Sequence, residues 1–253
     1  MPVALTREPS PAIHLCELTH VDRRGIDPDR AARQHAAYCR ALESAGCRII
    51  ALPPEPDLPD GVFVEDGAVV VDELAVLTRP GAPSRRQETA TIAEALSGFR
   101  PVHSIVSPGT LDGGDVLQAG RIIYVGRSGR SNADGIRQLS AILEPSGYEL
   151  VTLAVIGCLH LKTAVTRVGP DTVLLNPDMV DKEVFHGFQV VEVDPGEPMA
   201  ANALWLGETV IYPEAFPATR KRMERAGVAV QTVPADELAK AEGGVTCCSI
   251  LIR

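Results

Sequence analysis

Residues 111–129 read LDGGDVLQAGRIIYVGRSG, in which two β-rich runs follow a polar Asp-Gly-Gly-Asp start. Gly120 between the two runs marks a tight turn, so the stretch predicts a β-hairpin. Asp112 stands at the entrance to the first of the two strands. The stretch therefore predicts a small β unit with an acidic side chain at one end.

The same pattern recurs along the chain. Equivalent stretches begin at Glu65, Asp112, His160, Asn202 and Cys247. The steps between these positions are 47, 48, 42 and 45 residues, which is near-regular repetition of about five units. The last unit, GGVTCCSILIR at 243–253, has a single strand, so we expect the N-terminal segment to complete it. This closure predicts a cyclic, propeller-like α/β architecture; the alternative is an ordinary α/β sandwich with accidental spacing.

Four helices are expected between the β segments. Asp27 and Asn132 are capping residues for two of them, and Gly46 is a stop signal for the first. The expected ranges are about 28–45, 85–96 with Ser84 as its cap, 133–143, and 218–226 ending before Gly227. No Pro-, Gly- or Ser-rich linker divides the chain, so residues 1–253 are predicted to form one domain.

The composition argues against several classes of function. With 45% hydrophobic and 23% charged residues, the chain is typical of a globular protein. Its net charge is −9 and its basic residues are not clustered, which argues against nucleic acid as a partner. Because it has no run of about 18 apolar residues and no signal-peptide pattern, we expect a cytoplasmic protein without a membrane span. The six cysteines show no CxxC spacing, which argues against structural zinc and a disulfide framework.

In a cyclic arrangement, equivalent positions of successive units converge on the axis. This would bring together Glu65-Asp66, Asp112, His160 and Cys247. A cysteine nucleophile needs a nearby acid–base partner, usually histidine. Clustered carboxylates need a cation, and a planar guanidinium offers them up to five forked donors. Attack of a thiol on a guanidinium carbon is therefore coherent chemistry here. A metal ion is the other candidate cation, although the site would offer it only one histidine and one cysteine.

Each of these residues also has an ordinary structural interpretation. A lone thiol is usually a small buried apolar group, a histidine between leucines is usually a buried structural one, and carboxylates beside glycines are common in tight turns. Arg85-Arg86 fits a solvated helix start, although two arginines at a helix N-terminus hint at an anion to bind. Their common phase in the repeat favours the functional interpretation.

The Cys247-Cys248 pair raises the question of which sulfur reacts. Alternation along an extended strand places Cys248 on the face of Ile250 and Ile252, and Cys247 on the more polar face of Ser249. We therefore expect Cys248 in the core and Cys247 accessible. If carboxylates surround Cys247, its pKa should rise above the ordinary value of about 8.5 in the empty site, and a bound guanidinium should lower it.

Five segments together carry a family resemblance. They read VFVEDGAVVVDELAVLTRPGAPSRRQE (62–88), TLDGGDVLQAGRIIYVGRSGRSNADG (110–135), LHLKTAV (159–165), AAN (200–202) and GGVTCCS (243–249). In these segments the chain resembles the dimethylarginine dimethylaminohydrolase family of the guanidine-modifying (amidinotransferase/arginine deiminase) superfamily. The resemblance spans nearly the whole chain and implies a five-bladed α/β propeller, the pentein fold, built from ββαβ repeats.

The resemblance also implies a role for each matching residue. Cys247 matches the nucleophile that attacks the guanidinium carbon. His160 matches the general acid–base, which protonates the departing amine and then activates water, so that citrulline is left. Asp66 and Asp112, with Glu65 beside them, match the carboxylates that orient the guanidinium. The remaining matches are Arg85 and Arg130 for the substrate's α-carboxylate, and Leu18, Asp60 and Ala241 for the lid loop and the α-amino group.

The implied substrate is a small cationic guanidino amino acid, an arginine methylated on its guanidine, hydrolysed without cofactor or metal by a monomer or homodimer. The enzyme alternatives are a hydrolase that acts on arginine itself or on another modified guanidine, and an amidinotransferase that uses an acceptor amine. The alternative of a different class is a non-catalytic guanidine-binding homologue. Ser131 in RSN, Cys158 and the small Ala241 depart from the family pattern and bear on the N-substituent. The polar segment CELTHVDRRGIDPD (16–29) is expected to form a lid.

Overall fold

The computed structural model describes residues 1–253, and its strands are short. Their bounds are β1 Val3–Thr6, β2 Arg48–Ala51, β3 Ala68–Val70, β4 Ala75–Leu77, β5 Val102–Ser104, β6 Val116–Ala119, β7 Ile122–Arg127, β8 Glu149–Ala154, β9 Val165–Arg167, β10 Thr172–Leu175, β11 Gln189–Glu192, β12 Leu204–Trp205, β13 Val210–Pro213, β14 Val230–Val233 and β15 Ile250–Ile252. They form five three-stranded sheets: β15-β1-β2, β3-β4-β5, β6-β7-β8, β9-β10-β11 and β12-β13-β14. In each sheet an antiparallel pair is extended by a strand that runs parallel to the middle one.

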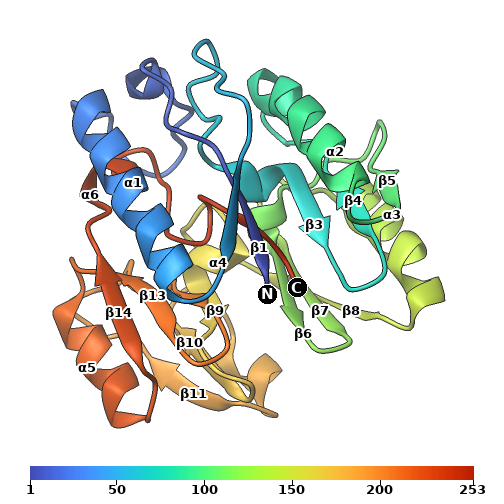
Figure 1. Cartoon of the computed structure of the whole chain (residues 1–253). Coiled ribbons are helices and arrows are strands. Elements are labelled where there is room, and N and C mark those ends of the chain that lie inside the picture. The colour runs from blue at the N-terminus through green and yellow to red at the C-terminus, as the bar shows by residue number, and fades with distance from the viewer.

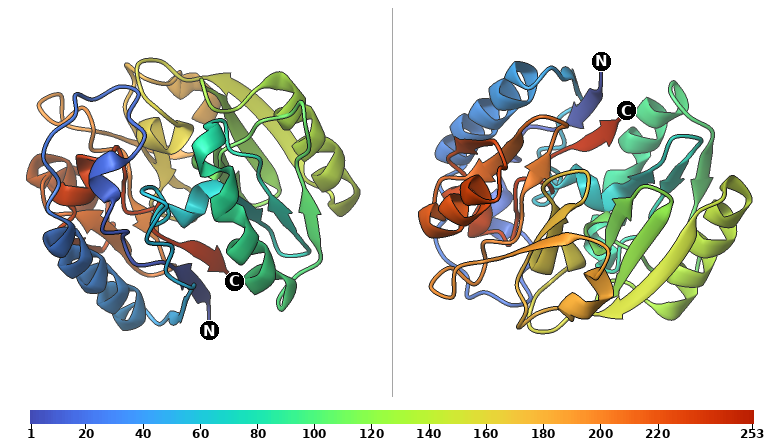
Figure 2. Two further views of the ribbon diagram at one scale, coloured as in Figure 1. Left: turned by 90° about the horizontal axis from the view of Figure 1, so that it is seen from above. Right: turned by 90° about the horizontal axis from the view of Figure 1, so that it is seen from below.

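The repeat of five units and its completion by the N-terminal segment are confirmed. β15 pairs antiparallel with β1, with Val3 opposite Ile252, and the two ends of the chain lie side by side (Figures 1 and 2). The first strands of neighbouring units also touch: β15 contacts β3, β6 contacts β9, and β9 contacts β12. The first strand of each unit therefore lies inside the molecule, and helices α1, α2, α3 and α5 lie at its periphery (Figure 1).

The helices are short apart from the first. Their bounds are α1 Pro28–Ser44, α2 Thr89–Ser97, α3 Ala133–Leu143, α4 Leu161–Ala164, α5 Pro217–Arg225 and α6 Asp236–Ala239. Six 3-10 turns accompany them: η1 Ile13–Leu15, η2 Val64–Gly67, η3 Pro83–Glu88, η4 Gly113–Asp115, η5 Glu144–Ser146 and η6 Lys182–Phe185. The predicted caps are confirmed, since the side-chain oxygens of Asp27 and Asn132 accept hydrogen bonds from the backbone amides of Arg30 and Gly135. None of these helices combines the length and the apolar character that crossing a bilayer requires.

The predicted start of the second helix is wrong. Residues 83–88 form a 3-10 turn and α2 begins only at Thr89. Three residues per turn place Arg85 and Glu88 on the same side, and their side chains pair in the interior at 2.9 Å. Ser84 does not cap the helix, because its hydroxyl donates to Glu17 Oε1 at 2.6 Å.

The predicted strand through the twin cysteines is also wrong, although the expected division between them holds. Cys247 and Cys248 lie in a turn, and β15 covers only Ile250–Ile252. The turn is closed by the Cys247 amide, which donates to the Gly244 carbonyl at 3.2 Å. Cys248 is buried in the cluster that includes Tyr38, and Cys247 is half-buried. Ser249 is not on a polar face, since it is buried and its hydroxyl bonds the hydroxyl of Tyr38 at 2.7 Å.

The apolar core is divided into clusters that join neighbouring units. On one side, Ile92 and Leu96 of α2 pack in a cluster with Val3 of β1 and Ile250 of β15. Four further clusters link the other helices and sheets in the same way. The centre is therefore left to the polar turns that precede the inner strands.

Candidate active site

The turns at the entrances of the units meet around a small enclosed cavity. Its wall contains twelve residues: Glu17, Asp60, Phe63, Asp66, Arg85, Arg130, Leu159, His160, Ala241, Glu242, Gly243 and Cys247. The cavity volume is about 10 Å³, which is room for about one water molecule. A larger ligand can therefore enter only when part of the wall moves.

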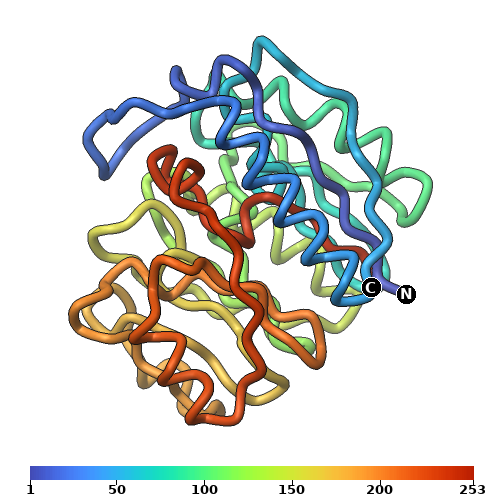
Figure 3. Tube along the Cα trace, turned by 60° about the vertical axis from the view of Figure 1, so that its left-hand side comes forward, coloured from blue at the N-terminus to red at the C-terminus, as the bar shows by residue number.

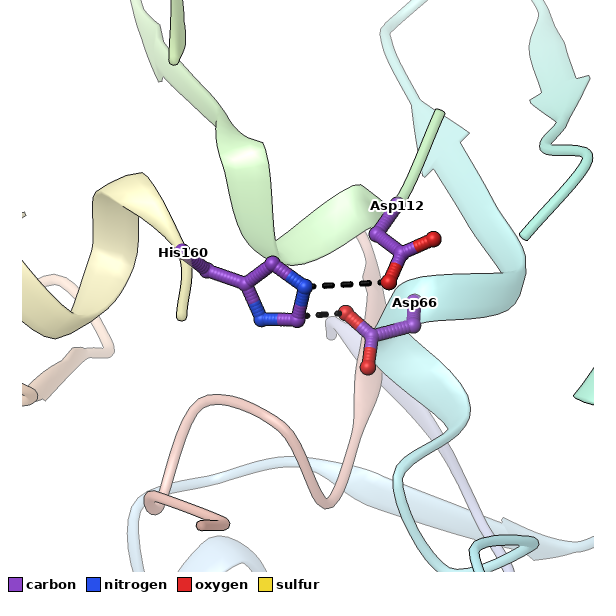
Figure 4. Close-up of side chains that lie close together, drawn as sticks. All are labelled: Asp66, Asp112 and His160. Atoms are coloured by element: carbon purple, nitrogen blue, oxygen red, sulfur yellow. Dashed lines mark hydrogen bonds and ion pairs between the residues drawn. The ribbon is translucent and has the colours of Figure 1, made fainter. Parts of the chain in front are cut away.

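His160 lies between two carboxylates at the centre of this wall (Figure 4). Its Nε2 is 3.0 Å from Asp112 Oδ2, and its Nδ1 is 3.9 Å from Asp66 Oδ1. All three side chains are buried, and they come from three successive units: Asp66 from η2, Asp112 from the start of η4, and His160 from the start of α4. The predicted convergence of these positions is thus observed.

The charges of this trio stabilise one another. Burial alone would lower the pKa of His160, but Asp66 and the bond to Asp112 reverse the effect and raise it to about 9. Burial would raise the pKa of Asp66, yet the charges of His160 and Arg85 lower it to about 2. At neutral pH the site therefore holds an imidazolium beside the ionised carboxylate of Asp66. The three ligand atoms lie within 4.8 Å of one another, as in a cation site, and the imidazolium supplies a positive charge there.

Asp66 is also fixed from its other side. Its Oδ2 accepts a bond from Arg85 Nη1 at 2.7 Å, and its Oδ1 accepts one from the Gly114 amide at 3.0 Å. Arg85 is buried and further bound to Glu88 and to the Phe63 carbonyl. Because these partners occupy most of its donors, Arg85 first of all holds Asp66 in place.

The two glycines of η4 are required by close approach. A side chain on Gly113 would collide with the Glu65 carbonyl, and a Cβ on Gly114 would lie 2.7 Å from His160 Nδ1 and 2.8 Å from Asp66 Oδ1. Such distances are too short for carbon. The Gly-Gly pair is therefore a condition for bringing the histidine and carboxylates together, and not only a turn signal.

Cys247 is held by a hydrogen-bond network beneath it. Its carbonyl accepts from the Glu65 amide at 3.1 Å, and its Sγ accepts from the Gly244 amide at 3.3 Å. The neighbouring Thr246 bonds Glu65 Oε2 at 2.7 Å and both ends of the Asn202 amide. These bonds fix the turn that carries the thiol.

The Cys247 thiol is neutral in the empty site. Burial and the negative charges of Glu65 and Asp66 raise its pKa to about 12. The direction agrees with the prediction from the sequence, but burial contributes more than the carboxylates. Lys162, whose Nζ is 2.6 Å from Glu65 Oε1, partly offsets this effect.

The structure gathers most, but not all, of the predicted site residues. Asp60, Ala241 and Arg130 line the cavity together with Asp66, Arg85, His160 and Cys247. Asp112 does not line it and reaches the site through its contact with His160. Glu65 lies behind Cys247 and does not line it, and Leu18 packs against the apolar cluster around α1 instead. Arg130 Nη1 is buried without a hydrogen-bond partner and lies 3.8 Å from Asp112 Oδ2, so it is available to a ligand.

Several residues of the site escaped the sequence analysis. Asn202 shares the phase of Asp112, His160 and Cys247 in the repeat, and this phase is a signal that it belongs to the site. Lys162 and Thr246 had no signal beyond being neighbours of predicted residues. Glu242 adopts a left-handed backbone (φ 58°), and its carboxylate accepts bonds from the amides of Thr19 and His20 in the expected lid. Figure 3 shows the two segments next to each other.

Asp115 is a buried carboxylate that positions His160 and Asp112. Its Oδ1 accepts from the Leu161 amide at 3.0 Å, directly after His160. Its Oδ2 accepts from the hydroxyls of Ser128 and Ser131, and Ser131 in turn accepts from the Asp112 amide at 3.2 Å. One carboxylate thus fixes the backbone on both sides of the His160–Asp112 bond.

We expect Asp115→Asn to destabilise the protein by about 1–3 kcal/mol and to lower turnover, because an amide cannot accept from all three donors and leaves one of them unpaired. Urea unfolding measures the first effect, and an assay of the activity proposed below measures the second. Asp178→Asn, at an exposed carboxylate, is the control and should change neither quantity. Wild-type stability and turnover in the Asp115 variant would contradict the positioning role.

Comparison with known proteins assigns the family. The family model described as N,N dimethylarginine dimethylhydrolase, eukaryotic, matches residues 21–250. The N(G),N(G)-dimethylarginine dimethylaminohydrolase of Pseudomonas aeruginosa is 40% identical over 226 residues, which cover 88% of this chain and 89% of the relative. The protein of the same name from Streptomyces coelicolor is 41% identical over 252 residues, covering 99% and 96%.

Solved structures agree with this assignment. The Pseudomonas aeruginosa enzyme, as a cysteine-to-serine mutant complexed with citrulline, superposes with a TM-score of 0.94 at 37% identity and 98% coverage of both chains. The N-terminal domain of ArgZ, an arginine dihydrolase from cyanobacteria, shares the fold at a TM-score of 0.86 and 19% identity, with 99% and 98% of the chains covered. The chain belongs to the N,N-dimethylarginine dimethylaminohydrolase family.

Proposed function

We propose that this protein hydrolyses N-methylated arginine to citrulline and methylamine or dimethylamine, with Cys247 as the nucleophile. The observation that carries the proposal is that a cysteine thiol shares one enclosed cavity with His160, Asp66 and two arginines. A chain of this family with the whole set in one cavity has the parts that the reaction needs.

In the first step, the guanidinium of the substrate lies beside Asp66 and Asp112. Its positive charge lowers the pKa of the Cys247 thiol, which loses its proton to solvent. The sulfur attacks the guanidinium carbon, and the C–N bond to the methylated nitrogen breaks as His160 donates its proton to the departing amine. The raised pKa of His160 supports this assignment, because it keeps the acid charged at neutral pH.

In the second step, His160, now neutral, removes a proton from a water molecule. The resulting hydroxide attacks the thiouronium carbon, and the C–S bond breaks as the hydroxyl proton passes to the sulfur, which restores the Cys247 thiol. Citrulline is released. The same imidazole thus serves as acid and then as base, and no redox partner is needed.

Arg130 is the residue we assign to the α-carboxylate of the substrate. Its buried Nη1 has no hydrogen-bond partner and calls for an acceptor, and a carboxylate is the acceptor that suits a guanidinium fork. Arg85, Asp60 and Ala241 complete the wall on this side. Arg85 contributes mainly through Asp66.

We also propose that residues 16–29 act as the lid. The cavity has no room for an amino acid while the Glu242 bonds to Thr19 and His20 hold the loop in place. Opening this loop would admit the substrate, and closing it would exclude water from the first step.

We also propose a sheet arrangement, a domain organisation and a cellular location. The five sheets are proposed to be blades of a propeller, with their first strands nearest the axis, because these strands contact one another from unit to unit. The pairing of β1 with β15 supports a single domain over residues 1–253. A cytoplasmic location is consistent with six free thiols.

A substrate panel tests the proposed function. Citrulline formation is measured with monomethylarginine, dimethylarginine, arginine and agmatine at equal concentrations. We expect the methylarginines to be turned over with the highest kcat/KM. Preference for arginine or agmatine would assign another guanidine hydrolase, and citrulline formation from none of them would overturn the proposal.

Alkylation of Cys247 by iodoacetamide should be slow at pH 7 and should accelerate about tenfold for each unit by which a bound guanidinium lowers its pKa. Guanidinium chloride at non-denaturing concentration is small enough to leave the thiol accessible. Peptide mass spectrometry separates Cys247 from the other five thiols, and sodium chloride is the control. A thiol that titrates near pH 6 without ligand would exclude activation by the substrate.

A further inference from the structure

A second and much larger cavity lies among the first strands of the five units. Its volume is about 420 Å³, and β3, β6, β9, β12 and β15 all contribute to its wall. It shares no lining residue with the catalytic cavity. Glu65 and Thr246 face the larger cavity, and their chain neighbours Asp66 and Cys247 face the smaller one. The two cavities therefore lie on opposite sides of the same polar turns.

The charged residues of this wall are mostly cationic, although the protein as a whole has a net charge of −9. The cations are Arg121, Lys162, Arg167 and Arg253, and the carboxylates are Glu65 and Asp72. Lys162 is paired with Glu65 at 2.6 Å, and Arg121 is paired with Glu73 at 2.6 Å. Neither Arg167 nor Arg253 has a carboxylate within 4.0 Å.

These two unpaired arginines gather around Trp205. The guanidinium carbon of Arg167 lies 4.8 Å from the centroid of the Trp205 ring, and that of Arg253 lies 5.5 Å from it. Arg167 Nε is buried without a partner, while its other nitrogens donate to the carbonyls of Gln118 and Pro170. Arg253 Nη2 donates to the Trp205 carbonyl at 2.9 Å. Backbone carbonyls and a ring face do not neutralise two full charges.

The two arginines repel each other, and the carboxylates of Asp171 and Asp72 act on them only from beyond 4.0 Å. Burial lowers the pKa of Arg167, and the positive charge of Arg253 lowers it further. Burial also lowers the pKa of Arg253. An anion between the two guanidinium groups would relieve the repulsion, and an oxyanion matches their donors in geometry.

We propose that this cavity is a binding site for a small oxyanion, held by Arg167 and Arg253 beside Trp205. Phosphate is the probe that represents this chemistry. The site is separate from the catalytic cavity and does not depend on the proposed hydrolysis.

Trp205 is the only tryptophan of the chain, so its fluorescence reports on the site directly. We expect inorganic phosphate to change this fluorescence saturably, with one site per chain in calorimetry, while sodium chloride at equal ionic strength does not. Arg167→Gln and Arg253→Gln should each weaken the apparent affinity at least about tenfold. Arg33→Gln, at an exposed arginine of α1, removes the same charge elsewhere and should leave affinity unchanged.

The catalytic cavity also contains arginines, so the test must distinguish phosphate binding there from phosphate binding in the larger cavity. Phosphate binding should persist in Arg130→Gln and should not be displaced by citrulline. The proposal is overturned if calorimetry detects no phosphate binding to the wild-type protein, or if chloride gives the same response. It is also overturned if phosphate binding is lost in Arg130→Gln and kept in Arg167→Gln and Arg253→Gln. Circular dichroism verifies that each variant is folded, and Arg167→Lys, which keeps the charge, should retain part of the affinity.

Discussion

Replacing Cys247 with serine is expected to abolish citrulline formation while ligand binding is retained. A serine hydroxyl is a far weaker nucleophile than a thiolate at neutral pH, and the neighbouring His160 is already protonated and cannot activate it. We expect turnover to fall by at least about 10³-fold, within the range seen when a covalent nucleophile is removed. Citrulline release measures turnover, and calorimetry with the substrate measures binding.

Cys248→Ser is the matched control, because it makes the same chemical change one residue away. Cys248 is 1% exposed, and its thiol donates weakly to the Gly244 carbonyl, a bond that a serine hydroxyl can replace. We expect a folded enzyme with near-normal kcat. Turnover that survives in the Cys247 variant, or that disappears in the Cys248 variant instead, would show that Cys247 is not the nucleophile.

His160→Gln should lower kcat by about 10²–10⁴-fold, the usual contribution of a positioned general acid–base. The amide can still bond Asp112, but it cannot donate a proton to the amine or accept one from water. His103→Gln is the control, since His103 is exposed on β5. An unchanged kcat in the His160 variant would exclude the proposed role.

The same variant should also change how stability depends on pH. The pKa of His160 in the folded protein, about 9, lies above its ordinary value of 6.5. Its protonation therefore stabilises the fold fully below about pH 6.5, and this contribution is lost as the pH rises through about 9. Thermal unfolding between pH 6 and pH 10 should show a smaller loss of stability in His160→Gln than in the wild type or in His103→Gln.

The architecture was largely predictable because it is repeated. The phase shared by Glu65, Asp112, His160 and Cys247 predicted five units and their convergence, and the caps at Asp27 and Asn132 fixed two helices to within a residue or so. Long-range contacts were less accessible. The 3-10 turn before α2 follows from the pairing of Arg85 with Glu88 and with Asp66, which no local pattern announces.

The site was predictable where residue type and phase coincided. Alternation along an expected strand correctly predicts that Cys248 is the buried cysteine. The strand itself is wrong, because both cysteines lie in a turn. Asp115 and Lys162 act through hydrogen bonds to partners that are distant in the sequence. A single sequence contains no local signal for such bonds, and only the folded geometry reveals them.

The pairing of β1 with β15 determines when, during folding, catalysis becomes possible. Val3 and Ile252 are separated by nearly the whole chain, and joining them costs loop-closure entropy that local contacts do not repay. Cys247 lies three residues before the start of β15, so the contact that places β15 also helps to place the turn that carries the thiol. A chain still emerging from the ribosome would display its histidine and carboxylates without a thiol beside them. Incompletely folded molecules would thus lack the assembled cavity that the proposed reaction requires.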